Sequence, residues 1–289
     1  MQSKNLPFIA ILLLCVLSIG CEVNTFNKDN AYGISFSENI SAGDVQKIIV
    51  NNVDGDINIR TQKSDEIEIT AEKLVTASSM ESARDFAHQV NIEVYRDGDI
   101  LRVETISPHS MSKNIGEVRV DYEIKIPQII DVEVFNTNGD IKVEDTDGYV
   151  DIATTNGDIV VDNTSSDIEA TNMNGDITLS DIDGGIDASS TNGNLDISIT
   201  SAKVNCKAQT TNGNITLYIR HDASTQGTVR TANGRIESDF SSERPRREGR
   251  LEFVLGSGDG KLDIWTTNGD IKLLKIDDGT YTSRKKTQK

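Results

Sequence analysis

The sequence predicts an all-β fold, a β-solenoid stacked from rungs of about 18–21 residues, with one short helix in its N-terminal part. The first observation is a recurring motif, of which Thr155-Asn156-Gly157-Asp158-Ile159 is one copy. Its turn glycines are Gly139, Gly157, Gly175, Gly193, Gly213, Gly234 and Gly269. Subtracting successive numbers gives steps of 18, 18, 18, 20, 21 and 35 residues. The second observation is that only 5% of residues are aromatic, which is typical of thin β architectures filled by Val and Ile.

Two strand arrangements share this period. In a meander each strand pairs with its neighbour in sequence, whereas in a solenoid it pairs with the equivalent strand one period on. The solenoid is favoured because the Asn-Gly turn recurs only at alternate corners, and stacking brings identical side chains into ladders. It predicts that Ile159 pairs beside Ile177 in a narrow core while Val160 faces the other way. Asn-Gly also indicates a tight turn, because both residues tolerate positive φ.

Residues 1–20 have the features of a lipoprotein signal peptide. Lys4 precedes the apolar run Phe8–Ile19, which is too short to span a bilayer permanently. Leu17-Ser18-Ile19-Gly20-Cys21 resembles a bacterial lipobox, which implies cleavage before Cys21 and acylation of that residue. The protein is therefore expected in the bacterial cell envelope, lipid-anchored to a membrane, with the outer membrane or cell surface favoured over the inner membrane. Residues 21–44 are polar and unpatterned, and are predicted to be a tether.

Residues 45–130 are predicted to form a β-rich subdomain with one helix. The alternating stretch Val45–Thr70 indicates strands, with an early copy of the turn at Asp54-Gly55. Ser78 and Glu81 fit a capping box, which places the helix start there. The apolar face of this helix consists of Met80, Ala83, Ala87 and Val90. A hairpin over Asn91–Val103 and a strand over Val118–Pro127 follow.

Residues 131–282 are predicted to form the repeat solenoid, and the basic segment 283–289 a disordered tail. The repeat is interrupted around Arg244, Arg246 and Arg247, a basic island in an acidic chain. This segment is either a solvated loop or a contact for an anionic ligand such as phosphate or an acidic sugar. Trp265 either seals the last rung or lies exposed for a sugar, and sealing is favoured because solenoid ends need a cap.

Charge and missing motifs limit the function. The net charge of −17 argues against a nucleic-acid partner, which needs a basic surface. No nucleophile elbow, P-loop, zinc-protease or Cys-x-x-Cys motif occurs, and His88, His109 and His221 are far apart. Cys206 fits a small buried hydrophobe better than a catalytic thiol. A non-enzymatic protein without a cofactor is expected.

The aspartates of the motif are candidate metal ligands. Asp140, Asp158 and Asp176 would stack at a spacing of about 4.8 Å and repel one another unless screened or bound to metal. Calcium is the metal that this arrangement suggests. Later repeats carry Asn194, Asn214 and Arg235 at this position, which argues against a continuous metal ladder.

The lipobox, the alternating strand ending at Ile126-Pro127 and the Asn-Gly-Asp-Ile units together resemble the bacterial adhesin-like β-strand-repeat family, a domain family of unknown function, over roughly residues 45–275. The resemblance implies an adhesive or scaffolding role, and it supplies no catalytic residues. The expected partners are the membrane, through the N-terminal lipid, and an envelope protein or glycan. Two alternatives stay open: a carbohydrate-active enzyme on a β-helix, and envelope-stress sensing through the loop from Arg244 to Arg250.

Overall fold

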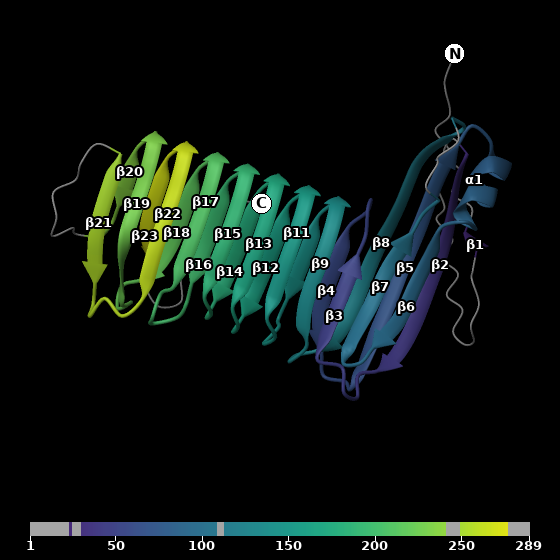
Figure 1. Cartoon of the computed structure of the whole chain (residues 1–289), viewed down its shortest axis with the longest axis horizontal. Helices are drawn as coiled ribbons and strands as arrows, with labels where there is room; N and C mark the ends of the chain where they lie inside the picture. Colours follow the sequence, from purple (N-terminus) through teal and green to yellow (C-terminus); the bar gives the residue numbers. More distant parts are fainter. Residues whose placement is uncertain (1–22, 25–29, 109–112, 241–248, 277–289) are drawn as a thin grey trace, which may run out of the picture.

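The computed structural model describes residues 23–24, 30–108, 113–240 and 249–276. These residues form two β-sheets that run along an elongated molecule (Figure 1). The twelve-stranded sheet is called sheet A and the eleven-stranded sheet is called sheet B. One short helix lies at the N-terminal end of the stack (Figure 1). The predicted all-β solenoid with a helix in its N-terminal part is therefore confirmed.

Each regular rung contributes one strand to each sheet, and an Asn-Gly corner joins the two. The strands in sheet B are β9 (Asp131–Asn138), β11 (Val150–Asn156), β13 (Ile168–Asn174), β15 (Ile186–Asn192) and β17 (Cys206–Asn212). The strands in sheet A are β10 (Ile141–Glu144), β12 (Ile159–Thr164), β14 (Ile177–Ile182), β16 (Leu195–Ile199) and β18 (Ile215–Arg220). Every strand pairs in parallel with the equivalent strand of the next rung.

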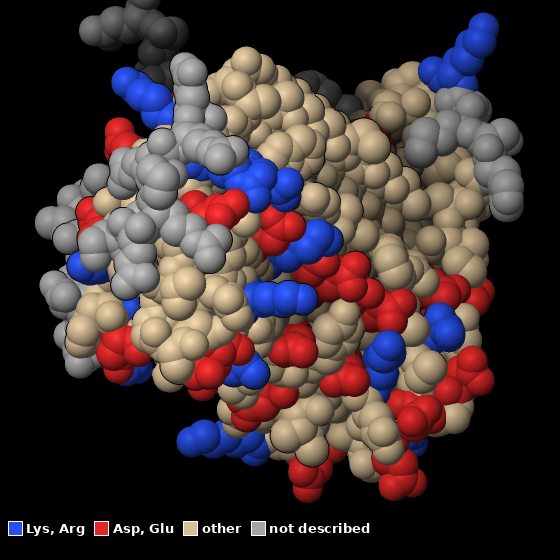
Figure 2. Space-filling model, turned by 60° about the vertical axis from the view of Figure 1, so that its left-hand side comes forward, with Lys and Arg blue, Asp and Glu red and all other residues tan. Residues whose placement is uncertain are grey.

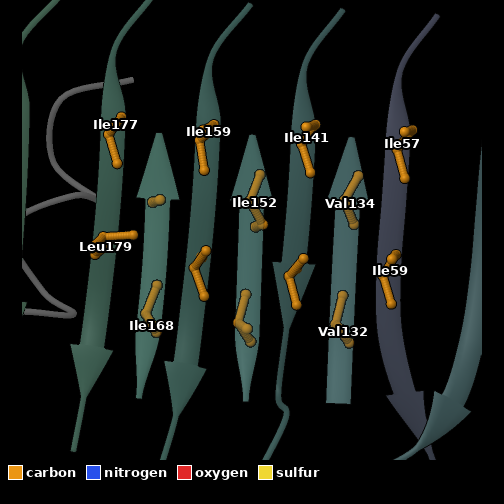
Figure 3. Close-up of a cluster of buried hydrophobic side chains, with 14 of the residues drawn as sticks. Ile57, Ile59, Val132, Val134, Ile141, Ile152, Ile159, Ile168, Ile177 and Leu179 are labelled. Carbon is orange, nitrogen blue, oxygen red and sulfur yellow. The ribbon is translucent and has the colours of Figure 1, made fainter. Parts of the chain in front are cut away.

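The core lies between the sheets and follows the period-two alternation of the sequence. Ile159 pairs with Ile177 and both are fully buried, while Val160 is only partly buried. Figure 3 shows Ile57, Ile141, Ile159 and Ile177 in one row across successive strands. Burial of each such side chain contributes about 1.5–3 kcal/mol. The solenoid prediction is confirmed and the meander is excluded.

The stack begins well before residue 131. Strands β3 (Lys47–Asn51) and β4 (Ile57–Gln62) form a rung that pairs in parallel with β9 and β10. Strands β7 (Ile100–Ile106) and β8 (Ile115–Pro127) pair in parallel with β3 and β4 on the other side. The sequence places the start of the solenoid at 131, but its rungs continue without a break into the segment 45–130.

The N-terminal end of the stack is closed by antiparallel strands. Strand β5 (Glu66–Ala77) pairs with β8, β2 (Ala31–Ser41) pairs with β5 along its whole length, and β1 (Val23–Asn24) pairs with β2. In sheet B, β6 (Asn91–Asp97) forms the predicted hairpin with β7. The tether predicted for residues 21–44 is therefore wrong from Ala31 to Ser41, because this segment is built into sheet A.

Helix α1 (Met80–Ala87) packs against β2 and β5. Its N-cap is Ser79, whose Oγ accepts the Ser82 backbone N–H at 3.1 Å, so the cap lies one residue beyond the predicted Ser78. The buried face includes Ala83 and Ala87 as predicted. Phe86, which the apolar spacing did not single out, is buried with them.

The C-terminal strands do not stack in the order of the chain. They are β19 (Thr225–Asn233), β20 (Ile236–Ser238), β21 (Arg250–Leu255), β22 (Lys261–Asn268) and β23 (Ile271–Ile276). Strand β22 lies between β17 and β19, and β23 lies between β18 and β20. Strand β21 runs antiparallel to β19 at the edge of sheet B. The last rung in sequence, β22 and β23, is thus inserted between the rung of β17 and β18 and the rung of β19 and β20.

Several predictions fall on residues that lie outside the described ranges. They are the signal peptide 1–20, Cys21, the arginines Arg244, Arg246 and Arg247, His109 and the tail 283–289. Within the described part of the chain, no helical segment has the length and hydropathy of a membrane span.

Candidate functional site

The repeated asparagines form a continuous ladder of amide hydrogen bonds along the corner. Asn156 Nδ2 donates to Asn138 Oδ1 at 2.8 Å, and Asn174 Nδ2 donates to Asn156 Oδ1 at 2.9 Å. The same bond continues through Asn192, Asn212, Asn268 and Asn233. Each rung is tied to its neighbours at this corner, so the recurrence of Asn is explained by structure.

The repeated glycines are required by close approach between rungs. A Cβ on Gly157 would lie 2.1 Å from the Gly139 carbonyl oxygen, and a Cβ on Gly175 would meet the Gly157 carbonyl in the same way. The φ of Gly157 is +136°, but the neighbouring Asn156 does not have a positive φ. Both turn residues tolerate positive φ, but in this turn only the glycine adopts it.

The glycine carbonyls are hydrogen-bonded by a set of inward polar side chains that the sequence analysis missed. Asn172 Nδ2 donates to the Gly157 carbonyl at 2.7 Å, and Thr210 Oγ1 donates to the Gly193 carbonyl at 3.0 Å. Equivalent donors are Asn136, Ser190, Thr231 and Thr266. All of them stand two residues before the motif asparagine, and this fixed position was the available signal.

The candidate calcium ligands have a structural role in the ladder. Asp158 N–H donates to Asp140 Oδ1 at 2.8 Å, and Asp176 N–H donates to Asp158 Oδ1 at 2.8 Å. Asparagine serves equally well at this position, since Asn214 N–H donates to Asn194 Oδ1. The three aspartates are exposed. Among the described residues no group of three or more His, Cys, Asp or Glu side chains is arranged to hold a metal ion.

The outward face of sheet B carries a column of acidic residues. Strand register places Asp151 directly between Glu133 and Glu169, and Glu169 beside Asp187. Partial burial and the neighbouring Glu169 and Glu133 raise the pKa of the Asp151 carboxyl, which Lys47 partly offsets. The column is therefore a row of like charges that the protein stabilises only in part.

The ends of this column are paired with lysines. Lys47 Nζ lies 3.0 Å from Glu133 Oε2, and Lys207 Nζ lies 2.9 Å from Asp187 Oδ2. Its middle instead contacts Tyr149, whose hydroxyl donates to Glu169 Oε2 at 3.3 Å.

Sheet B also carries the exposed hydrophobic side chains of the strands. Within the described ranges, every large hydrophobic residue that is exposed inside a strand belongs to this sheet. These residues are Tyr95, Ile106, Phe135, Met173, Val254 and Trp265. All six point outward, because the residue before each of them lies on the inward side of its strand, as Val134 does before Phe135 and Ile264 before Trp265. The two outward faces of the stack thus differ in chemistry.

Trp265 does not seal the stack. It lies on β22, which is flanked by β17 and β19, and its side chain is 38% exposed between Gln209 and Arg230. The alternative of an exposed tryptophan is the one that the structure shows. The alternation of Leu262 and Ile264 into the core was the signal for this orientation.

A groove of about 860 Å³ crosses the same face over β15, β17, β22, β19 and β21, and its lining residue Arg230 is the cross-strand neighbour of Trp265. Its charged lining residues are Lys207, Arg230, Glu252, Lys261 and Asp263. Arg230 lies 2.8 Å from Asp263, and Arg250 lies 2.6 Å from Glu252. Figure 2, in which the C-terminal end comes forward, shows acidic and basic side chains interspersed over the face. The sequence analysis missed this groove because three of its strands meet out of chain order.

Among the described residues, Cys206, His88 and His221 lie in separate environments. Cys206 is buried, and burial raises the pKa of its thiol, as suits a small hydrophobic residue. The ring of His88 packs near Tyr32, with the ring centroids 6.1 Å apart, and His221 is exposed in a separate loop.

Comparison with known proteins gives a family and a set of similar folds. The family model described as Toastrack DUF4097 matches residues 39–274. A structure of a candidate adhesin from Bacteroides fragilis is 14% identical, with a TM-score of 0.45 over 84% of this chain and 97% of that one. A candidate cell adhesion protein from Clostridium sporogenes is 11% identical, with a TM-score of 0.40 over 84% and 99%.

A candidate lipid-binding protein from Parabacteroides distasonis is 9% identical to the chain. Its TM-score is 0.38, over 84% of this chain and 97% of that one. No curated protein matches the chain.

Proposed function

The chain belongs to the Toastrack DUF4097 family of adhesin-like domains of unknown function. On this premise we propose that it is a non-enzymatic cell-envelope protein that is anchored by lipid. We propose further that it binds its partner through the outward face of sheet B. The observation that carries the proposal is the segregation of exposed hydrophobic residues. Tyr95, Phe135 and Met173 lie on this face, whereas no strand of sheet A in the described ranges exposes a large hydrophobic residue to that extent.

The anchor is proposed from the sequence alone. The lipobox ending at Cys21 supports attachment by acyl chains at the N-terminus. Each buried methylene of an acyl chain contributes about 0.8 kcal/mol, so several chains hold a protein firmly on a membrane. Attachment at one end leaves the long faces of the stack available to an envelope protein or glycan.

A non-enzymatic role is supported by the ion pairing of the carboxylates in the groove. A glycoside hydrolase needs two carboxyl groups free to act on the two sides of a scissile bond. The groove contains Glu252 and Asp263, and each is ion-paired with an arginine. Pairing with arginine favours a role of both carboxylates in binding polar groups over proton transfer to a substrate.

The test is co-sedimentation of the detergent-solubilised full chain with envelope fragments of the producing bacterium. A variant with Tyr95→Ser, Phe135→Ser and Met173→Ser changes only exposed side chains of sheet B. We expect its affinity to fall by about tenfold or more, equivalent to roughly 1.4 kcal/mol.

The matched control carries Val160→Ser and Leu274→Ser, which lie in partly buried, outward positions of sheet A. This control should sediment like the unaltered chain. Equal affinity of the sheet B variant and the unaltered chain would remove the basis for the proposal.

A further inference from the structure

The groove beside Trp265 has the size of a ligand site. Its volume of about 860 Å³ falls in the range of roughly 300–1,000 Å³ that is usual for small-molecule sites. It lies on five adjacent strands of one sheet, so its side chains are held by a rigid backbone. Asn205, Gln226 and Thr228 add uncharged polar groups to its lining.

The charges around the groove compensate one another. Lys207 is paired with Asp187, Arg230 with Asp263, and Arg250 with Glu252, at 2.9, 2.8 and 2.6 Å. With Lys261 included, the charged groups around the groove are four cations and three carboxylates, so the site lacks the cluster of several uncompensated cations that would select a phosphate or an acidic sugar. Ion pairs of this kind present N–H donors and carboxylate acceptors side by side. A hydroxyl group is both a donor and an acceptor, so a polyhydroxylated neutral ligand matches this pattern.

Trp265 supplies the apolar surface that such a ligand needs. Cross-strand register places it between Gln209 and Arg230, and it lies two residues from Asp263 on the same side of β22. The residue is 38% exposed although it stands in the interior of a sheet. An exposed indole offers a broad apolar face together with an N–H donor. The C–H groups of a pyranose ring can pack on that face while its hydroxyls reach the ion pairs.

We propose that this groove, with Trp265 at its side, is a binding site for a neutral oligosaccharide segment of an envelope polysaccharide. The inference deepens the proposed function, on which it rests, by assigning a ligand class to one part of the outward face of sheet B. The sugar lies across β17, β22 and β19, with one ring against Trp265 and hydroxyls hydrogen-bonded to Arg230 and Asp263. No bond of the sugar is broken.

The chain offers a direct readout, because Trp265 is its only tryptophan. The full-length protein in detergent micelles is titrated with neutral tetrasaccharides that contain glucose, mannose or N-acetylglucosamine, and with tetragalacturonate as the anionic counterpart. We expect a saturable blue shift of tryptophan emission with at least one neutral tetrasaccharide and none with tetragalacturonate. A response to the anionic sugar alone, or to none of the sugars, would overturn the proposal.

Variants are compared by calorimetry, which does not need the tryptophan. Trp265→Ala should weaken binding of the active tetrasaccharide by about tenfold or more. Tyr218→Ala is the matched control, since Tyr218 is an outward-facing aromatic residue of β18 in the opposite sheet, sheet A. The core separates Tyr218 from the groove, so sugar binding should stay within roughly twofold.

Equal losses in the two variants would refute the assignment to this groove. The outcome is separable from that of the envelope experiment, which leaves Trp265 intact. Envelope binding that depends on Tyr95, Phe135 and Met173, with silent sugar titrations, would sustain the proposed function and reject the groove.

Discussion

Gly157 illustrates how close the backbones of successive rungs come to one another. A methyl group there would meet the Gly139 carbonyl at 2.1 Å, at a φ of +136°. Backbone cannot move aside without breaking the ladder, so we expect Gly157→Ala to lower the free energy of unfolding by about 3 kcal/mol. The measurement is the denaturant midpoint.

Gly98→Ala provides the comparison for this variant. Gly98 also has a positive φ, +67°, but a Cβ there would have no heavy atom within 4 Å. Gly98→Ala should therefore lower the free energy of unfolding by only about 1 kcal/mol, through backbone strain. Equal losses at the two positions would mean that conformation, and not the approach of the next rung, explains the glycine.

Ile159 and Val160 test the assignment of the two strand faces. Ile159 is fully buried and contacts the next rung at Ile177, whereas Val160 is partly exposed. Ile159→Asp loses about 1.5–3 kcal/mol of burial and also places a carboxylate in the core. We expect its denaturant midpoint to fall well below that of Val160→Asp, and equal midpoints would contradict the observed orientation.

Asp151 should make stability depend on pH. Its folded-state pKa is raised, chiefly by burial and by Glu169 and Glu133, so its ionised form destabilises the fold. This penalty is absent below the unfolded pKa of about 3.9, grows between that pH and the raised folded pKa, and is fully present above the folded pKa. We expect Asp151→Asn to gain about 0.2–1 kcal/mol at pH 7. The gain should vanish near pH 3 in urea titrations.

Asp187→Asn is the control for this pH dependence. Asp187 stands in the same outward column but is paired with Lys207, and this pairing raises the pKa of the lysine. Removing its charge should therefore give no gain at pH 7. A gain of the same size at both positions would show that general charge repulsion, and not the crowding at Asp151, is responsible.

At the scale of the strand, the sequence predicted the strands that recur with the motif and did not predict strands that have no repeat. The motif predicted that Ile159 pairs with Ile177, because identical residues recur at the same position of each rung. Strand β2 was missed because its segment has no copy elsewhere, although Tyr32 and Ile34 are buried. The inward alternation of Leu262 and Ile264 indicated that Trp265 faces outward, whereas the expected need for an end cap favoured a sealing position.

The asparagine ladder predicts a difference between inner and terminal rungs. Asn174 donates one ladder bond to Asn156 and accepts another from Asn192, whereas Asn233 in the described structure takes part only by donating to Asn268. A hydrogen bond contributes about 0.5–1.5 kcal/mol. Asn174→Ala should therefore cost about twice as much as Asn233→Ala in denaturant midpoint. Equal costs would indicate that the ladder bonds are exchanged for water without loss.

At the scale of the whole molecule, the groove could not be predicted because its position depends on the inserted rung. The step of 35 residues to Gly269 is compatible with two successive periods. It does not reveal that β22 enters between β17 and β19. Lys207, Asp263 and Arg230 are brought together only by this crossing.

The inserted rung predicts an asymmetric pattern of hydrogen exchange. Ile264 is fully buried in β22, and Val229 is fully buried in β19, farther out. Ile264→Asp should remove protection from β22, β23 and the outer strands β19–β21 together, because their inner support is lost. Val229→Asp should expose β19–β21 and leave β22 protected through β17. If β22 and β19 lost protection at different rates in the Ile264→Asp variant, the two strands would not unfold as one cooperative unit.

The inserted rung also orders events during synthesis. A chain emerging from the ribosome presents Thr225–Leu255 before Lys261–Ile276 exists. If β19 docks on β17 early, it occupies the place that β22 takes in the final structure. The nascent chain must therefore either hold β19–β21 apart or release them again when β22 arrives. Completion of the C-terminal half thus depends on its last strands, because a chain that stops before Lys261 has no β22 to place beside β17.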